Sequence, residues 1–177
     1  MIKKPIVVIP AVINHAIGNK YGGWGWMEYS KKAWKYWCDK NGYELVIYDK
    51  CKISDLVKYR VTVQRWFDIH DFLEERGVEY SKVLMVDACS IPHWDCPDFF
   101  KLTGDNMCGM NDLDNLGWVY ESVEGYKHMF DNFNFDITKY MNSGWVIFNK
   151  SHKKLFKQFE KYYLENFDEF YNLSNPT

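Results

Sequence analysis

Apolar and polar positions alternate along the chain in blocks that predict strands and helices in turn. Ile6–Ile13 is a continuous run rich in β-branched residues, which is typical of a strand buried on both faces. Trp26–Lys40 has apolar residues at helical spacing and is followed by the helix stop Asn41-Gly42, so it predicts a helix. Tyr43–Tyr48 predicts a second strand. This strand–helix–strand order implies a parallel pair of strands joined by a right-handed crossover.

The alternation continues through the rest of the chain. Val61–Glu75 predicts a helix with one apolar stripe, closed by Gly77. Lys153–Tyr171 predicts an amphipathic helix near the end of the sequence. Three shorter apolar stretches predict further strands: Lys82–Val86, Asn106–Asn111 and Trp145–Phe148.

Two stretches show no regular period. Asn14–Gly25 contains four Gly and predicts a loop. Asp112–Thr138 is polar, aromatic and aperiodic, so we expect irregular structure there that shapes a pocket. The 177 residues show no repeat, low-complexity tract or linker. The sequence therefore predicts a single α/β domain over residues 1–177, with a mainly parallel central sheet flanked by helices.

Composition and charge narrow the classes of partner. Hydrophobic residues make up 47% of the chain and charged residues 26%, both ordinary for a globular protein. The net charge of −2 provides no global basic field, so nucleic acid and anionic membranes are not expected partners. The aromatic share of 19% is high, and such side chains either fill a core or stack on sugars and bases. Composition leaves both uses open.

The longest apolar run and the cysteines bear on location and on metals. Ile6–Ile13 contains Pro10 and is too short to span a bilayer, so we expect an intracellular, cytoplasmic protein.

The five Cys are dispersed and odd in number, so no disulfide framework is expected. Cys89, His93 and Cys96 form only a fragment of a zinc-site spacing. Buried, unreactive thiols are therefore the favoured interpretation.

Asp87 is the leading candidate for chemistry. It follows the predicted strand Lys82–Val86 and opens a Pro-containing loop, and ligands of α/β folds bind outside the carboxyl ends of the strands. A carboxylate at this place can hold a divalent cation that neutralises phosphates. The alternative is that Asp87 caps the following turn through its own backbone. The sequence leaves both alternatives open.

Other polar residues occupy comparable places. Asp49 ends the second predicted strand and can bond a base or a ribose, with Tyr48 stacking on the base; a solvated turn is the alternative. Arg60 and Arg65 lie near the start of a predicted helix, where a guanidinium can bond phosphate oxygens in a bidentate way. The Gly of Asn142-Ser143-Gly144 allows close approach of a hydroxyl-rich ligand, and an ordinary turn is the alternative.

Three longer segments carry motifs in a characteristic order. VTVQRW (residues 61–66) places a cation three residues after Val-Thr, and YSKVLMVDACSIPHWDCPDFF (80–100) is a strand that ends in an acidic residue before a Pro-containing loop and a Phe-Phe pair. YMNSGWVIFNKSHKKLFKQF (140–159) is an Asn-Ser-Gly strand that leads to a Lys-rich helix. Together they resemble the GT-A-fold, nucleotide-sugar-dependent glycosyltransferases, particularly the glycogenin and bacterial galactosyltransferase type.

The resemblance implies a GT-A, Rossmann-like domain that transfers a sugar from a nucleotide-diphosphate donor to a glycan or other hydroxyl acceptor. The donor that it favours is a UDP-sugar. It implies that Asp87 contacts the donor ribose and a Mn²⁺ or Mg²⁺ ion that bridges the diphosphate. Asp112 and Asn142 would border the sugar and the acceptor and are the candidate catalytic residues. The implied donor-binding residues are Val8, Pro10, Ala11, Tyr48, Asp49, Arg65, Asp87, Ala88 and Asn142.

The chain departs from the family pattern in two places. Cys89 stands where the second carboxylate of Asp-x-Asp is expected. The implied metal ligands are then Asp87 and Cys89, yet a thiol matches Mn²⁺ or Mg²⁺ poorly, and the alternative is that Cys89 simply packs. The sequence also stops about where the family continues with an Asp-Gln motif and a metal-binding His, so we expect a chain that lacks the family's C-terminal portion. A non-catalytic sugar- or nucleotide-binding relative is the alternative to an enzyme.

Overall fold

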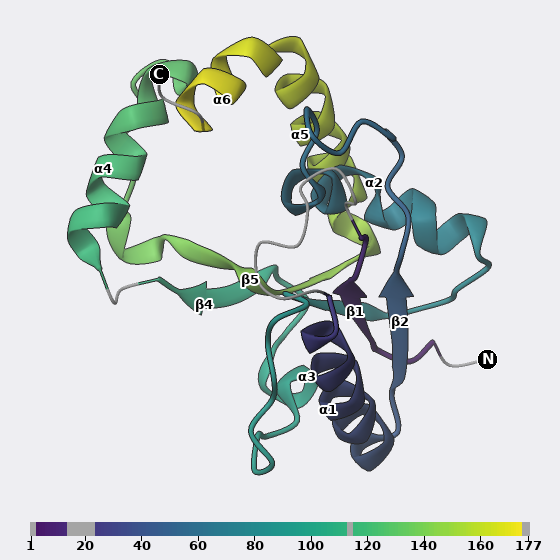
Figure 1. Cartoon of the computed structure of the whole chain (residues 1–177). Coiled ribbons are helices and arrows are strands. Elements are labelled where there is room, and N and C mark those ends of the chain that lie inside the picture. The colour runs from purple at the N-terminus through teal and green to yellow at the C-terminus, as the bar shows by residue number, and fades with distance from the viewer. Residues whose placement is uncertain (1–2, 14–23, 113–114, 175–177) are drawn as a thin grey trace.

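The centre of the molecule is one five-stranded sheet (Figure 1). The computed structural model describes residues 3–13, 24–112 and 115–174. The strands lie in the order β2-β1-β3-β5-β4. Their bounds in chain order are β1 Ile6–Pro10, β2 Glu44–Tyr48, β3 Lys82–Val86, β4 Cys108–Asn111 and β5 Met141–Asn149.

Helices cover both faces of this sheet, with α1 and α3 on one face and α2 and α5 on the other (Figure 1). Their bounds are α1 Trp26–Asn41, α2 Val61–Glu75, α3 Phe99–Leu102, α4 Leu116–Tyr126, α5 Lys153–Glu165 and α6 Phe167–Ser174. No helix among the described residues is long and apolar enough to cross a membrane.

The side chains of β1 explain why both faces are covered. All five of its residues are buried. Because successive side chains of a strand point to opposite faces, Val7 and Ile9 pack in the cluster that includes α1, while Ile6 and Val8 pack in the cluster that includes α2. A strand that is apolar at every position therefore needs a helix on each side, as its unbroken apolar run predicts.

The parallel half of the sheet places a crevice at the ends of two strands. β1 pairs in parallel with β2 on one side and with β3 on the other, which confirms the predicted parallel pair. The chain runs from β1 outward to β2 and then returns to β3 across β1. Strand order thus reverses between β1 and β3, and open α/β sheets bind their ligands at such a switch point.

The other half of the sheet is antiparallel, so the prediction of a mainly parallel sheet is wrong. β5 runs antiparallel to β3, and β4 runs antiparallel to β5. Periodicity predicts that a stretch is a strand, but the direction of a strand depends on how the preceding segment returns to the sheet. The consequence is local: the pairing of Val86 with Trp145 places Gly144 beside Asp87, whose main-chain N–H donates to the Gly144 oxygen at 2.9 Å.

The stretch 112–138 is more regular than expected. It contains α4 and the 3₁₀ helices Lys127–Phe130 and Ile137–Lys139, the first and last of the three capped by Asn115 and Asp136. The buried residues of α4 are Val119 and Val123, which are too few to give a recognisable apolar stripe. The loop predicted over 14–25 lies mostly outside the described residues.

The C-terminal helix is divided, and it contacts the segment around α4. Asn166 ends α5 by donating from its main chain and its side chain to the Tyr162 oxygen, and α6 follows. The ring of Phe130 stacks on that of Tyr162 at 5.3 Å, and the Tyr162 hydroxyl donates to the Met129 oxygen. We call the segment from 115 to 140 the arm. Figure 1 shows its α4 and the helix α6 meeting away from the sheet.

Two ionisable side chains are buried between α2 and the sheet. Asp68 accepts hydrogen bonds from the Tyr48 hydroxyl at 2.7 Å and from the Lys52 N–H at 2.9 Å, and burial raises the pKa of its carboxyl to about 6. The Nδ1 of His70 lies 2.6 Å from the Tyr80 hydroxyl, and burial lowers the pKa of the imidazole to about 4. Burial therefore favours the neutral form of both groups.

These two groups have opposite effects on the free energy of unfolding as pH changes. The variant Asp68→Asn removes one of the two effects and is expected to reveal the other. The raised pKa of Asp68 makes the folded state lose stability as pH rises from about 4 to 6, whereas the lowered pKa of His70 makes it gain stability from about 4 to 6.5. Each effect is on the order of 3 kcal/mol. The free energy of unfolding of the variant, measured in urea, should therefore rise between pH 4 and pH 7 by about 3 kcal/mol more than that of the wild type. Parallel curves would contradict this assignment.

Candidate functional site

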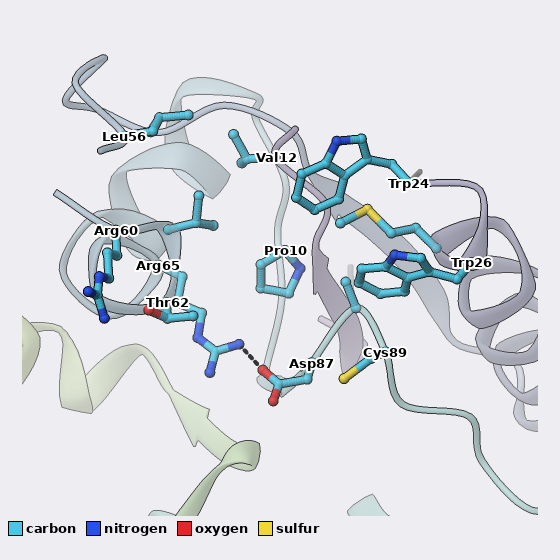
Figure 2. Close-up of a pocket in the computed structure, with 13 residues that line it drawn as sticks. Pro10, Val12, Trp24, Trp26, Leu56, Arg60, Thr62, Arg65, Asp87 and Cys89 are labelled. Atoms are coloured by element: carbon cyan, nitrogen blue, oxygen red, sulfur yellow. Dashed lines mark hydrogen bonds and ion pairs between the residues drawn. The ribbon is translucent and has the colours of Figure 1, made fainter. Parts of the chain in front are cut away.

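A cavity of about 340 Å³ opens at the carboxyl ends of β1 and β3, at the switch point of the sheet (Figure 2). The first residues of α1 form one wall and the first residues of α2 form another. Its apolar lining includes Pro10, Val12, Trp24, Trp26 and Leu56, and its polar lining includes Arg60, Thr62, Arg65, Asp87 and Cys89. It thus combines aromatic and aliphatic walls with a small number of convergent polar groups, the usual composition of a ligand site.

An ion pair between Arg65 and Asp87 forms the polar side of the cavity. Arg65 Nη1 donates to Asp87 Oδ1, and Figure 2 shows the two side chains pointing toward each other. Arg65 Nη2 donates to the Ser143 oxygen at 3.0 Å. The side chain of Arg65 is only 4% exposed, whereas that of Asp87 is 39% exposed. A buried cation is thus held in place by two elements, while its carboxylate partner remains open to the cavity.

The loop after Asp87 is fixed by contacts that leave the carboxylate available. The main-chain oxygen of Asp87 accepts from the Ser90 N–H at 2.9 Å and closes the turn. The Ser90 oxygen in turn accepts from the Ser30 hydroxyl at 2.6 Å and from Trp34 Nε1 at 3.2 Å, both on α1. The backbone rather than the side chain of Asp87 therefore makes this turn.

Gly144 allows the two oxygens nearest to it to converge. A Cβ atom there would lie 2.6 Å from Asp87 Oδ2 and 2.8 Å from Asn142 Oδ1. Asn142 Oδ1 already accepts from the Gly144 N–H at 2.7 Å, and Asn142 Nδ2 donates to Asp112 Oδ2 at 3.2 Å. Asp112 and Asn142 are therefore neighbours, and they are linked to Asp87 through Gly144, although neither lines the cavity itself.

The start of α2 gives the cavity a second source of positive potential. The helix begins after Arg60, whose side chain makes no capping hydrogen bond, and its first turn contains no acidic residue. Val61 and Thr62, in that first turn, line the cavity. The first N–H groups of a helix lack intrahelical partners and carry partial positive charge, so this end of α2 favours an anion.

Four predicted donor-binding residues line the cavity, and others lie elsewhere. Pro10, Arg65, Asp87 and Ala88 belong to its lining, together with the predicted metal ligand Cys89. Two are buried in the core instead: Val8 in the middle of β1 and Ala11, whose N–H donates to the Tyr48 oxygen at 2.8 Å.

The expected roles of Tyr48 and Asp49 at the base do not match the structure. Tyr48 is fully buried, and its hydroxyl bonds Asp68, so its ring cannot stack on a base. Asp49 is exposed, pairs with Arg76 and is not part of the cavity lining. Sequence periodicity does not tell which face the last residue of an edge strand points to, and this residue points toward α2.

Trp24 and Trp26 are the cavity residues that sequence reasoning missed. Their rings lie 6.2 Å apart, on the side of the cavity opposite Arg65 (Figure 2). The sequence signal is Gly22-Gly23-Trp24-Gly25-Trp26, two aromatic residues among glycines at the start of a helix. The pattern of the sequence predicts only a loop for Trp24 and a helical stripe for Trp26. Such a pair offers flat apolar surface suited to a ring of a ligand.

The donor atoms beside Asp87 do not fit a Mn²⁺ or Mg²⁺ ion, which prefer several oxygen ligands. Arg65 donates to Asp87 Oδ1, and the next polar side chain along the loop that lines the site is the soft thiol of Cys89. In the described parts of the chain, no group of three or more His, Cys, Asp or Glu residues is placed to hold a metal, and this includes Cys89, His93 and Cys96.

The prediction of buried thiols is correct for two of the five Cys. Cys38 and Cys51 are buried, whereas Cys89 is exposed, and all five are free. Burial raises the pKa of Cys38 to about 12 and that of Cys51 to about 11, so both remain protonated and unreactive. The prediction is wrong for Cys89 because the loop after β3 turns its thiol into the cavity rather than into the core.

Comparison with known proteins identifies a shared fold. No protein-family model and no curated protein sequence matches the chain. A solved structure described as the "crystal structure of a glycosyltransferase involved in the glycosylation of the major capsid of PBCV-1" matches with a TM-score of 0.58 over 98% of this chain and 76% of that chain, at 10% sequence identity. The chain shares the fold of that structure. At this identity the likeness shows the fold alone, with a mixed sheet flanked by helices.

Proposed function

We propose that the protein is a glycosyltransferase that moves a sugar from a nucleotide-diphosphate donor, a UDP-sugar foremost, to a glycan or other hydroxyl acceptor. The observation that carries this proposal is the Arg65–Asp87 pair, which faces a ligand-sized cavity at the switch point of a fold that a glycosyltransferase shares. The resemblance of the segments around Arg65, Asp87 and Asn142 to GT-A glycosyltransferases supports the same reaction.

The chemistry of the walls suggests how the donor lies. The rings of Trp24 and Trp26 and the aliphatic surface of Pro10 suit a planar base. The partial positive charge at the start of α2 and the guanidinium of Arg65 suit the diphosphate. Asp87 Oδ2 is left to accept hydrogen bonds from the ribose hydroxyls. One donor molecule thereby satisfies all three kinds of surface.

The reaction then needs stabilisation of the leaving group and an acceptor for a proton. The bond between the anomeric carbon and the diphosphate oxygen breaks, a bond to the acceptor oxygen forms, and the acceptor loses its proton. Arg65 and the start of α2 offset the negative charge that develops on the diphosphate. We assign the acceptor's proton to Asp112, which Asn142 orients through the 3.2 Å hydrogen bond.

A non-catalytic relative that binds a nucleotide or sugar is the second candidate. The observation that favours it is Cys89, which stands where the family resemblance places a second carboxylate. Such a protein would bind the donor in the same cavity but would release no UDP from it. The two candidates therefore differ in turnover and agree in binding.

The test is a thermal-shift screen of UDP-, GDP-, CMP- and dTDP-sugars followed by an assay for release of free nucleotide. A ligand that binds only the folded state at about 100 times its dissociation constant adds about 2.7 kcal/mol to stability. We expect a shift with one nucleotide class and release of that nucleotide when a hydroxyl acceptor is present. A shift without release across acceptors would favour the binding relative, and no shift with any donor would refute both candidates.

Gly144→Ala is expected to weaken UDP binding by about tenfold or more and to destabilise the fold by about 1–3 kcal/mol. The added Cβ would lie 2.6 Å from Asp87 Oδ2, so the carboxylate must move away from its position beside Arg65. Gly104→Ala is the matched control, because a Cβ there meets nothing within 4 Å. Titration calorimetry with UDP and urea unfolding measure the two effects. Equal affinities for both variants would show that Asp87 does not contact the nucleotide.

A further inference from the structure

We infer that the positive charge that neutralises the donor's phosphates is built into the chain, from Arg65 and the start of α2, and that the site works without a divalent cation. The inference rests on the proposed function, since it presumes a diphosphate in this cavity. It also assigns a specificity-determining role to Cys89, the residue whose side chain decides whether a metal can bind beside Asp87.

Arg65 is placed as a permanent counter-charge. Only 4% of its side chain is exposed, and two of its guanidinium nitrogens are fixed by Asp87 and by the Ser143 oxygen. Its Nε is buried and has no hydrogen-bond partner among the described residues. A cation held this way needs no reorganisation when an anion arrives, which is what charge stabilisation by a protein requires.

The start of α2 adds to this charge from an independent element. An acidic residue or a side-chain cap would occupy the N–H groups of the first turn, and α2 has neither. Val61 and Thr62, the first two residues of this turn, line the cavity next to Arg65 on the same helix. The two donors therefore face the same space, and a phosphate group can accept from both.

The acceptors that a metal would need are committed elsewhere or are of the wrong kind. Asp87 Oδ1 is bonded to Arg65, and Asn142 Oδ1 accepts from the Gly144 N–H. A divalent cation on Asp87 Oδ2 would share one carboxylate with the guanidinium of Arg65, and the two positive charges would repel each other. The remaining side chain on this rim, Cys89, is a thiol, which binds Mn²⁺ and Mg²⁺ poorly.

Cys89 is exposed, so its replacement changes the chemistry of the rim with little effect on the core. Cys89→Asp adds a hard carboxylate two residues after Asp87 and creates the paired oxygen ligands that Mn²⁺ prefers. The same added charge repels the phosphates when no metal is present. The variant is therefore expected to become dependent on Mn²⁺, while Cys89→Ser, which adds no charge, is expected to remain independent of Mn²⁺.

The experiment measures the dissociation constant of UDP by titration calorimetry for all three proteins, in Mn²⁺ and in EDTA. We expect the wild type and Cys89→Ser to bind UDP with affinities that differ by less than about threefold between the two conditions, and Cys89→Asp to bind at least about tenfold more tightly with Mn²⁺. The wild-type affinity should also fall with added NaCl, because fixed charges on the protein are screened.

Two results would overturn the inference, and they are distinguishable. Wild-type binding that is at least about tenfold weaker in EDTA would show that a metal supplies the charge, and the proposed function would stand. An absence of binding in both conditions, for UDP and for GDP, CMP and dTDP, would remove the proposed function and the inference together. The comparison of wild-type binding in Mn²⁺ and in EDTA decides the outcome, so the test holds even if a Cys89 variant fails to fold. Cys89→Ser controls for the loss of the thiol.

Discussion

Arg65→Met is expected to weaken UDP binding by about 100-fold or more, an effect of about 2.7 kcal/mol. Two losses combine in this variant. The cavity loses the guanidinium that, on the proposed function, bonds the phosphates, a charge-assisted interaction worth about 1.5–3 kcal/mol. Asp87, which that guanidinium neutralises, becomes an unpaired carboxylate facing the same phosphates. Titration calorimetry with UDP at low salt measures the change.

The control for this variant is Arg76→Met. Arg76 is also on the α2 side of the molecule and is also paired with a strand-end carboxylate, Asp49, but its side chain is 46% exposed and does not line the cavity. Its removal should leave UDP affinity unchanged within about threefold. Arg65→Met with the affinity of the wild type would place the phosphates elsewhere. Urea unfolding of both variants checks that binding is measured on folded protein.

Asp87→Asn is expected to lower the rate of sugar transfer by about 100-fold or more while it keeps the shape of the side chain. The neutral amide has one acceptor oxygen in place of two, so it cannot pair with Arg65 through one oxygen and accept from the ribose hydroxyls through the other. Release of UDP from the donor in the presence of an acceptor is the measurement. A lower melting temperature should accompany the change, because the buried guanidinium loses its charged partner.

Asp49→Asn is the matched control for this prediction. Asp49 directly follows β2 as Asp87 directly follows β3, so both are carboxylates at the carboxyl end of a strand in the same sheet. Only Asp87 lines the cavity. Equal loss of transfer in both variants would mean that the donor extends over β2 and that the cavity at the switch point is not its main site.

The sequence predicted best what depends on local periodicity. The bounds of α2 and β3 match the predicted ranges at both ends, because a single apolar stripe and a short β-branched run are local properties. Because α2 carries Arg65 and β3 ends just before Asp87, the same prediction placed both residues in the site. Both side chains lie at the cavity because each belongs to an element whose type and end were clear from the sequence.

Features that depend on distant contacts could not be predicted in the same way. The direction of β5 follows from the path of the arm, and α4 buries only a narrow strip of its surface. Tyr48 was placed at the base because it ends a strand, yet its hydroxyl is satisfied by Asp68, which lies twenty residues away on α2. Trp24 lies in a stretch without a period, and Trp26 counts in the sequence only as part of a helical stripe, because the wall that the two rings form exists only in the folded molecule.

The arm has a consequence for how the acceptor side of the site moves. Its outer end is fastened to the C-terminal helices by the stacking of Phe130 on Tyr162 and by the 2.7 Å hydrogen bond between His128 Nε2 and Glu169 Oε1. Its inner end is flanked by Asp112 and Asn142, which bond each other and are linked to Asp87 through Gly144. Movement of the arm away from the C-terminal helices would therefore have to break both contacts. The helices at the end of the chain thus act as a brace for residues that lie far from them along the sequence.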